Sequence, residues 1–263
     1  MEPTFSEFSY GFAVTQESAS GKFGTLTAAP VIPSLYREGQ AGGGWDVNIP
    51  LRGAPLFLQF KLSHYLRRSN ALERAKFGGP YYRMYIRPLR YSDQHVLLTD
   101  LENSGKIVYY VAPRFHTVEE LNDAYTTGNV LRESAFFRPS AIGNLPDIDS
   151  HYVVFSKSGL TWAIFSDEPK EKGPLYSGID IAEIESSRFK EQTSEIDDAF
   201  FNRLANGLVE ILDKRAKDMG ILKEFHYQIQ HQKERSKEKV SFAAYLTRVF
   251  FDAELLVVGE SIN

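Results

Sequence analysis

The sequence contains no cysteine, which excludes disulfide bonds, cysteine-based zinc sites and cysteine nucleophiles. No apolar run approaches membrane-spanning length, and the first residues, Met1-Glu2-Pro3, do not resemble a signal peptide. The sequence also lacks the Gly-x-Ser-x-Gly and His-Glu-x-x-His patterns, so serine hydrolases and zinc proteases lack their starting residues. We therefore expect a cytoplasmic protein with no membrane partner.

The composition is typical of a soluble globular protein with a sizeable core. Of 263 residues, 43% are hydrophobic and 13% are aromatic. This length suits one large domain or a domain with an appendage. The formal net charge is −4, so contact with nucleic acid would need a local basic patch.

The stretch from Trp45 to Ser63 has the pattern of two strands joined by a short turn at residues 52–53. Side chains alternate across a strand, so the second strand has a purely apolar face and a face with an amide and an ammonium group. These faces consist of Leu56, Leu58, Phe60 and Leu62, and of Phe57, Gln59, Lys61 and Ser63. A two-residue turn would place Asp46 opposite Gln59, with their Cβ atoms about 5 Å apart. A slip of one residue would destroy this cluster.

At these residues the chain resembles the PD-(D/E)XK nuclease superfamily. The family pattern is an acid near the end of one strand, then an acid or Gln, any residue and Lys on the next. Here Asp46 is followed by Gln59-Phe60-Lys61, and the resemblance extends over roughly residues 5–115. It implies an α/β (α+β) fold with a restriction-endonuclease-like mixed central β-sheet flanked by helices. It also implies a Mg²⁺- or Mn²⁺-dependent endonuclease that hydrolyses phosphodiester bonds, most commonly of DNA, in bacterial restriction or anti-phage defence.

The chemistry of phosphodiester hydrolysis gives each of these residues a role. Mg²⁺ prefers oxygen ligands and keeps several waters. Asp46 would supply a carboxylate, Gln59 an amide oxygen and Phe60 its main-chain carbonyl. Lys61 is suited to hold the attacking water or to stabilise the negative charge of the transition state.

The resemblance also implies a further acid on an upstream helix. Glu7 is the first candidate and Glu17 the second, because a helix over residues 5–18 would carry both. Such an acid matters because Gln59 is neutral where an acid is commoner, so metal affinity falls unless Glu7 or Glu17 compensates. The alternative for Glu7 is a capping box with Thr4.

A basic stretch follows the strand pair, with tyrosines interleaved. Its cations and rings are Arg67, Arg68, Arg74, Lys76, Arg83, Arg87 and Arg90, and Tyr81, Tyr82, Tyr85 and Tyr91. Cations contact phosphates and tyrosines stack on bases. The sequence predicts a nucleic-acid groove formed by Arg67, Arg68, Arg83, Arg87 and Arg90. The alternative is a set of surface ion pairs with acids elsewhere.

Hydrophobic periodicity predicts the remaining elements. Helices are expected over residues 5–18, 92–103, 118–125, 194–217, 222–239 and 242–258, strands over 81–89 and 107–112, and a hairpin over 151–165. The strand, helix and strand between residues 81 and 112 suggest a crossover unit in a mixed sheet. We expect a nuclease-like domain over residues 1–168, a connector over 169–193 and a C-terminal helical region over 194–263 packed on the domain.

A rival interpretation belongs to another functional class. The chain could be a non-catalytic protein that keeps the nuclease-like fold and binds nucleic acid or a partner subunit. The sequence leaves open DNA versus RNA, site preference, and whether the chain forms a homo-oligomer.

Overall fold

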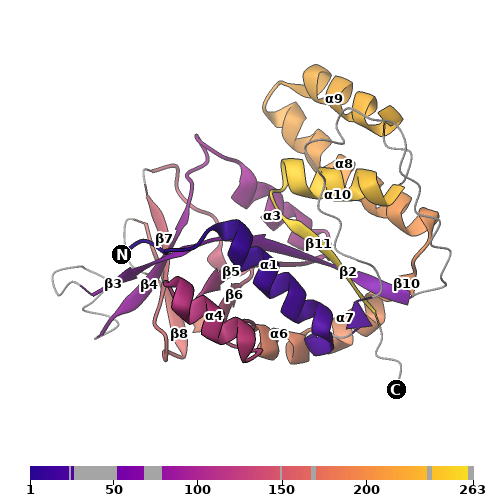
Figure 1. The fold of residues 1–263 in the computed structure, drawn as a ribbon. Helices are drawn as coiled ribbons and strands as arrows, with labels where there is room; N and C mark the ends of the chain where they lie inside the picture. Colours follow the sequence, from indigo (N-terminus) through magenta and orange to yellow (C-terminus); the bar gives the residue numbers. More distant parts are fainter. Residues whose placement is uncertain are drawn as a thin grey trace.

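The computed structural model describes residues 1–23, 25–26, 52–67, 79–148, 150–166, 170–235 and 239–259. These residues form a mixed α+β fold that contains two β-sheets and several helices (Figure 1). None of the helices in these ranges combines the length and the apolar character that a membrane-spanning segment needs.

The first sheet is mixed, as predicted. Its strand order is β1 (Thr25–Leu26), β11 (Glu254–Gly259), β2 (Arg52–Phe60), β5 (Ile107–Pro113) and β6 (Ser134–Phe137), and β10 (Ser194–Glu195) pairs with the start of β2. Strands β2 and β5 run parallel, whereas the other pairs are antiparallel. Strand β2 therefore lies inside the sheet, with a neighbour along each edge.

The second sheet is antiparallel throughout. Its order is β3 (Ser63–Leu66), β4 (Tyr81–Ile86), β7 (His151–Phe155), β8 (Thr161–Phe165) and β9 (Lys170–Pro174). The pairing of β7 with β8 confirms the predicted hairpin. The predicted crossover unit is wrong, because β4 and β5 belong to different sheets and the parallel partner of β5 is β2.

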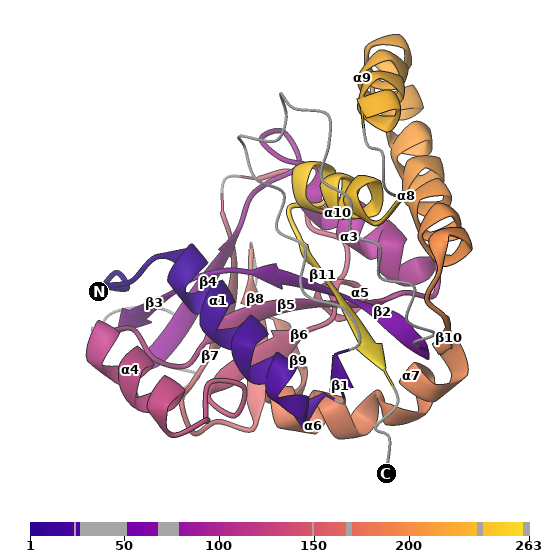
Figure 2. The ribbon, with the colours of Figure 1, turned by 45° about the vertical axis from the view of Figure 1, so that its right-hand side comes forward.

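Helices cover both faces of the first sheet (Figure 2). They are α1 (Glu7–Glu17) with the π-helical turn η1 (Ser18–Lys22), α3 (Gln94–Asn103), α4 (Val118–Thr126), α5 (Pro139–Ile142), α6 (Gly178–Ile184), α7 (Ser186–Gln192), α8 (Asp198–Asp218), α9 (Leu222–Arg235) and α10 (Lys239–Phe250). Helices α1, α4, α6 and α7 share one hydrophobic cluster with the sheet. Helices α3, α5, α8, α9 and α10 share the opposite cluster together with the second sheet. The predicted connector over residues 169–193 thus contains β9, α6 and α7.

The alternation predicted for β2 is confirmed. Leu56, Leu58 and Phe60 point into the cluster formed with α1, whereas Phe57 points into the opposite cluster. Both faces of β2 are buried because helices or the second sheet cover each of them. This arrangement accounts for the nearly continuous apolar run in the sequence.

The predicted turn at residues 52–53 is wrong, because both residues lie within β2. Strand β11 takes the antiparallel position along β2, from Leu58 opposite Glu254 to Gly53 opposite Gly259, and β5 takes the other edge. Residues 45–50, the first strand of the predicted hairpin, lie outside the described residues, and Asp46 is among them.

Strand β11 also corrects the predicted helix over residues 242–258. Helix α10 ends at Phe250, and the chain turns at Asp252 into β11. The apolar residues of this stretch fit a helical period, but their second half lies in a strand. Pairing with the buried strand β2 outweighs the local pattern.

The capping-box explanation of Glu7 is wrong as well. The N-cap of α1 is Ser6, whose hydroxyl oxygen accepts a hydrogen bond from Ser9 N at 3.1 Å. The Thr4 hydroxyl oxygen instead accepts from Val118 N at 2.8 Å, at the start of α4. Glu7 is therefore left without a capping role.

Helix α1 approaches the end of β2 closely at Gly11. A Cβ atom on Gly11 would lie 2.7 Å from Cδ2 of Phe60, a contact that real Cβ atoms essentially never make. The missing side chain lets the first turn of α1, including Glu7, lie beside the end of β2.

We expect the same substitution to have opposite effects at two helical glycines. Gly11→Ala should destabilise the protein by about 1–3 kcal/mol, because the added methyl group displaces the buried Phe60 ring. Gly207→Ala in α8, where a Cβ meets no atom within 4 Å, should stabilise it by about 0.5–1 kcal/mol. Urea denaturation measures both changes. A Gly11→Ala variant as stable as the parent would show that Phe60 moves without cost.

Candidate functional site

Four chain segments meet where β2 ends. They are the first turn of α1, the residues that end and follow β2, the first turn of α3, and the turn between α10 and β11. Their polar side chains are Glu7, Gln59, Lys61, Gln94 and Asp252, which we call the β2-end cluster.

Hydrogen bonds fix the two amides of this cluster. Gln94 Nε2 donates to Asp252 Oδ2 at 2.7 Å and to Gln59 Oε1 at 3.0 Å. Gln59 Nε2 donates to the Phe60 main-chain oxygen at 2.8 Å and reaches Asp252 Oδ2 at 3.4 Å. Reversing the Gln59 amide would place its oxygen against two acceptors, so the network determines the orientation.

Lys61 carries the cation of the cluster. Its side chain is only 20% exposed, and Nζ lies 3.9 Å from Asp252 Oδ2. Burial lowers the pKa of Lys61, while the carboxylates of Glu7 and Asp252 raise it and Arg87 lowers it. The amine is thus held in a poorly hydrated place with two carboxylates nearby.

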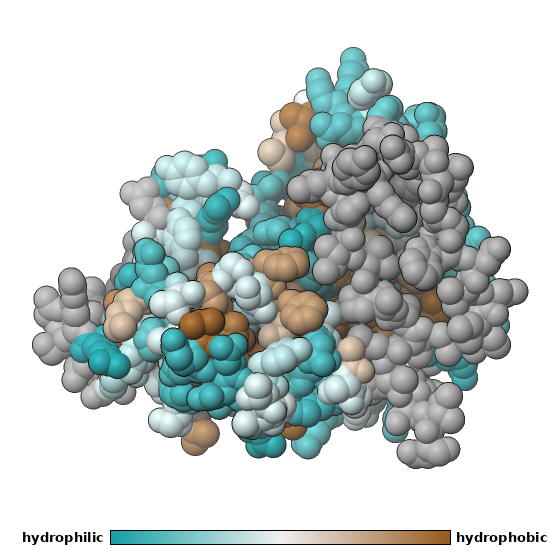
Figure 3. All heavy atoms as spheres, viewed as in Figure 1, coloured by the Kyte–Doolittle hydropathy of each residue, from teal (hydrophilic) through white to brown (hydrophobic). Residues whose placement is uncertain are grey.

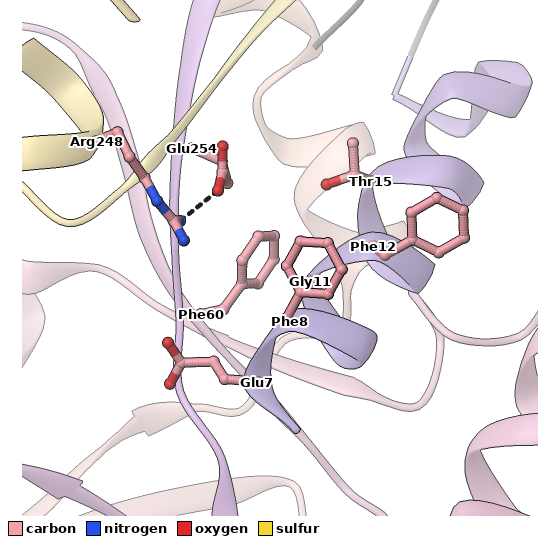
Figure 4. Close-up of a pocket in the computed structure, with 8 residues that line it drawn as sticks. All are labelled: Glu7, Phe8, Gly11, Phe12, Thr15, Phe60, Arg248 and Glu254. Atoms are coloured by element: carbon pink, nitrogen blue, oxygen red, sulfur yellow. Dashed lines mark hydrogen bonds and ion pairs between the residues drawn. The ribbon is translucent and has the colours of Figure 1, made fainter. Parts of the chain in front are cut away.

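The pKa of Glu7 is shifted upward, opposite to the shift of Lys61. The residue is exposed as a whole, but its carboxyl end extends from the start of α1 toward β2 (Figure 4). Loss of hydration there raises the pKa of Glu7, and Lys61 opposes the rise. Asp252 raises the pKa of Glu7 further, since two carboxylates in one place repel each other.

Asp252 holds an uncommon backbone conformation. It is the one non-glycine residue in the described ranges with a positive φ, at 48°. Such residues are uncommon and favour Asn and Asp. The turn directs the Asp252 carboxylate to Gln94, Gln59 and Lys61, while its side chain stays 54% exposed.

A pocket of about 80 Å³ adjoins the cluster (Figure 4). Its wall consists of α1 and Phe60, and an ion pair between Arg248 and Glu254 lies on the opposite side. Burial raises the pKa of Glu254, and Arg248 opposes this rise. The α1 side is apolar where it meets solvent, because Phe8 and Phe12 are 66% and 54% exposed. Apolar side chains are visible over α1 in the middle of the face drawn in Figure 3.

The structure brings together three of the residues proposed from the sequence, Glu7, Gln59 and Lys61. The Phe60 carbonyl also faces this network, where it accepts from Gln59. Glu17 does not join them. Its carboxylate is buried at the other end of α1, where it accepts from Lys22 Nζ at 2.5 Å and from Leu131 N at 3.1 Å.

Asp252 and Gln94 belong to the cluster although no sequence pattern predicts them as site residues. The apolar spacing predicts a helix through Asp252, and its position far along the chain from Lys61 gives no indication of a shared site. Gln94 lies one residue inside a helix, in a position where glutamine is ordinary. In the sequence, the one indication of a turn at Asp252 is that this residue interrupts the apolar pattern between Phe251 and Ala253.

The basic residues follow the second sheet. Arg83 lies over the Tyr152 ring at 4.2 Å, Arg67 over Tyr65 at 5.1 Å, and Arg90 over Tyr91 at 5.1 Å. Arg87 follows β4 and lies near enough to the β2-end cluster to lower the pKa values of Glu7 and Lys61. Arg68 lies outside the described residues.

The cluster suits a hard metal ion by its donor chemistry. In the described ranges, no group of three or more His, Cys, Asp or Glu side chains is arranged to hold a metal ion. Mg²⁺, however, needs only one or two carboxylates, with waters completing its shell. Glu7 and Asp252 offer two carboxylates, and Gln59 and Phe60 offer carbonyl oxygens. All four groups are oxygen donors, so the set fits Mg²⁺ or Mn²⁺.

Comparison with known proteins gave no relative. No protein-family model matches the chain, and the searches of curated proteins and of solved structures found no match.

We expect two substitutions to move the pKa of Lys61 in opposite directions. Glu7→Gln removes a carboxylate that raises it, so the pKa should fall further below its usual value. Arg87→Gln removes a cation that lowers it, so the pKa should rise. Side-chain NMR titration of isotopically labelled lysines measures both. Shifts of the same sign in the two variants would contradict the arrangement of charges described above.

Proposed function

We propose that the protein is a metal-dependent nuclease that hydrolyses phosphodiester bonds at the β2-end cluster. The observation that carries this proposal is the meeting of Glu7, Lys61 and Asp252 at the end of one buried strand. These three residues come from distant parts of the chain, and burial alone disfavours the charged forms of Glu7 and Lys61. Such desolvated groups of opposite charge are common at catalytic centres.

The residues of the cluster suit distinct tasks. Glu7 and Asp252 would hold Mg²⁺ or Mn²⁺, with the carbonyl oxygens of Gln59 and Phe60 beside them. When bound, the ion would activate a water and relieve the charge that builds on the phosphate. Asp46, which lies outside the described residues, stays a predicted ligand.

Lys61 and Gln94 support this site in different ways. The Lys61 ammonium would donate to the attacking water or to a phosphate oxygen whose charge increases in the transition state. Gln94 orients both Gln59 and Asp252 through its two hydrogen bonds. It acts as a positioning residue, because it holds the groups that would contact the metal ion.

The proposed substrate is DNA, bound along the second sheet. Arg83, Arg67 and Arg90 each lie against a tyrosine ring, and Arg87 lies close to the cluster. Arginines bind phosphate and tyrosines stack on bases, so this surface suits a polyanion with flat rings. A restriction-endonuclease-like fold, membership of the PD-(D/E)XK superfamily, and a role in restriction or anti-phage defence belong to this proposal.

One observation favours a second candidate, a non-catalytic nucleic-acid- or partner-binding protein. Both ends of the Gln59 amide and the Phe60 carbonyl already have hydrogen-bond partners within the chain. A carbonyl oxygen has a second lone pair, so these bonds do not exclude a metal ion. These hydrogen bonds do lower the number of polar groups in the cluster that lack a partner within the described chain and could bind a ligand.

The decisive experiment is degradation of plasmid DNA by the purified protein with Mg²⁺ or Mn²⁺. We expect EDTA to abolish the activity and Lys61→Ala to lower it by about 100-fold or more, the usual effect of losing a donor to the transition state. Asp252→Asn should lower it as strongly. Asparagine tolerates the positive φ of residue 252, so this variant should fold normally.

The matched control is Lys223→Ala, which removes an exposed lysine on α9, remote in sequence from the cluster. Its activity should equal that of the parent protein. Equal cleavage by all variants would mean a contaminating nuclease or a different site. DNA binding without cleavage under either metal ion would favour the non-catalytic candidate.

A further inference from the structure

A second pocket lies at the opposite end of β2 from the β2-end cluster. Its volume is about 400 Å³, and its lining includes Lys106, Gln192, Ser194, Phe200, Arg203 and Leu204. These residues come from the residue before β5, the end of α7, the short strand β10 and the start of α8. Strand β10 pairs with the start of β2, and both views show the beginning of α8 beside them (Figures 1 and 2).

Among the described residues that line this pocket, two are cations and none is acidic. Lys106 is partly buried and Arg203 is exposed. Among the residues that the structure describes, no carboxylate forms an ion pair with either of them. Nearby Arg188, by contrast, is bound to Glu185 at 2.9 Å.

The Lys106 ammonium group therefore loses hydration on burial without gaining an ion pair with a described carboxylate. Within the described part of the chain, burial is the one cause that lowers the pKa of Lys106, and no carboxylate there opposes the shift. A cation that has lost hydration without gaining a partner destabilises the folded state. A bound anion would offset this penalty.

The rest of the lining suits an organic anion. The Gln192 side chain is fixed, because its Nε2 donates to Gly105 O at 2.8 Å. The Ser194 hydroxyl adds a donor, and Phe200 and Leu204 add an apolar side. Small-molecule sites commonly combine an apolar wall with a few fixed polar groups in a volume of about 300–1,000 Å³.

We propose that this pocket binds a small phosphate-bearing ligand of the nucleotide class. The phosphate lies between Lys106 and Arg203, and the flat base lies against Phe200 and Leu204. Two cations match a phosphomonoester, which carries a charge of about −1.5 to −2 near neutral pH. A single carboxylate would leave one of the cations without a partner. The arginine adds the forked donor geometry that phosphate accepts.

This site does not rest on the proposed nuclease activity. It lies at the other end of β2, and its ligand can be measured by direct binding. Calorimetric titration in EDTA with AMP, inorganic phosphate and adenosine separates the contributions of the phosphate and the base. We expect AMP to bind more tightly than phosphate, and adenosine to show no measurable binding.

Two substitutions and two matched controls locate the site. Lys106→Gln and Arg203→Gln should each weaken AMP binding by about tenfold, the effect of losing one charged hydrogen bond. Lys190→Gln on α7 and Lys214→Gln on α8 remove the same charge outside the pocket and should leave the affinity unchanged. Lys61→Ala should also bind AMP normally, which separates this pocket from the β2-end cluster.

Three results would overturn the proposal. The first is no binding of AMP or phosphate at millimolar concentration by the folded parent protein. The second is equal weakening in the control variants, which would indicate unspecific attraction to surface charge. The third is binding of adenosine as tight as that of AMP, which would remove the phosphate from the recognition. Thermal unfolding of every variant checks that it is folded.

Discussion

The pairing of β11 with β2 is the contact on which the rest of the structure depends. Strand β11 pairs with one edge of β2 and β5 pairs with the other. Hydrophobic clusters cover both faces, so β2 is buried on every side. The same pairing fixes the turn before β11, and with it Asp252. A strand that completes the core thereby also delivers a carboxylate to Lys61. The register between β11 and β2 therefore determines both the packing of the core and the geometry of the polar cluster.

Charge burial distinguishes the candidate sites from the structural ion pairs. Glu185 is fully buried, and Arg138, Arg188 and the Tyr109 hydroxyl bind both of its carboxylate oxygens. Lys61 is mostly buried with a single carboxylate at 3.9 Å. A fully bonded charge serves the fold, whereas an incompletely bonded one retains the capacity to bind a ligand or to move a proton.

The sequence was informative wherever local pattern and burial agree. The β7–β8 hairpin, the mixed sheet and the alternating faces of β2 followed from it, and so did the grouping of Gln59 with Lys61. It failed where contacts join distant segments. The helical spacing that ends with Ala253 and Leu256 predicts a helix over residues 254–258, but pairing with β2 makes this segment a strand. Asp252 and Gln94 were missed because no local pattern links them to Lys61.

The distance along the chain between β2 and β11 has a consequence for folding kinetics. Their paired residues are about 200 positions apart, so the pairing closes a very long loop. Such non-local contacts are entropically costly to form and slow the approach to the native state. The polar cluster is complete only after β11 has paired with β2, because that pairing fixes the turn that holds Asp252.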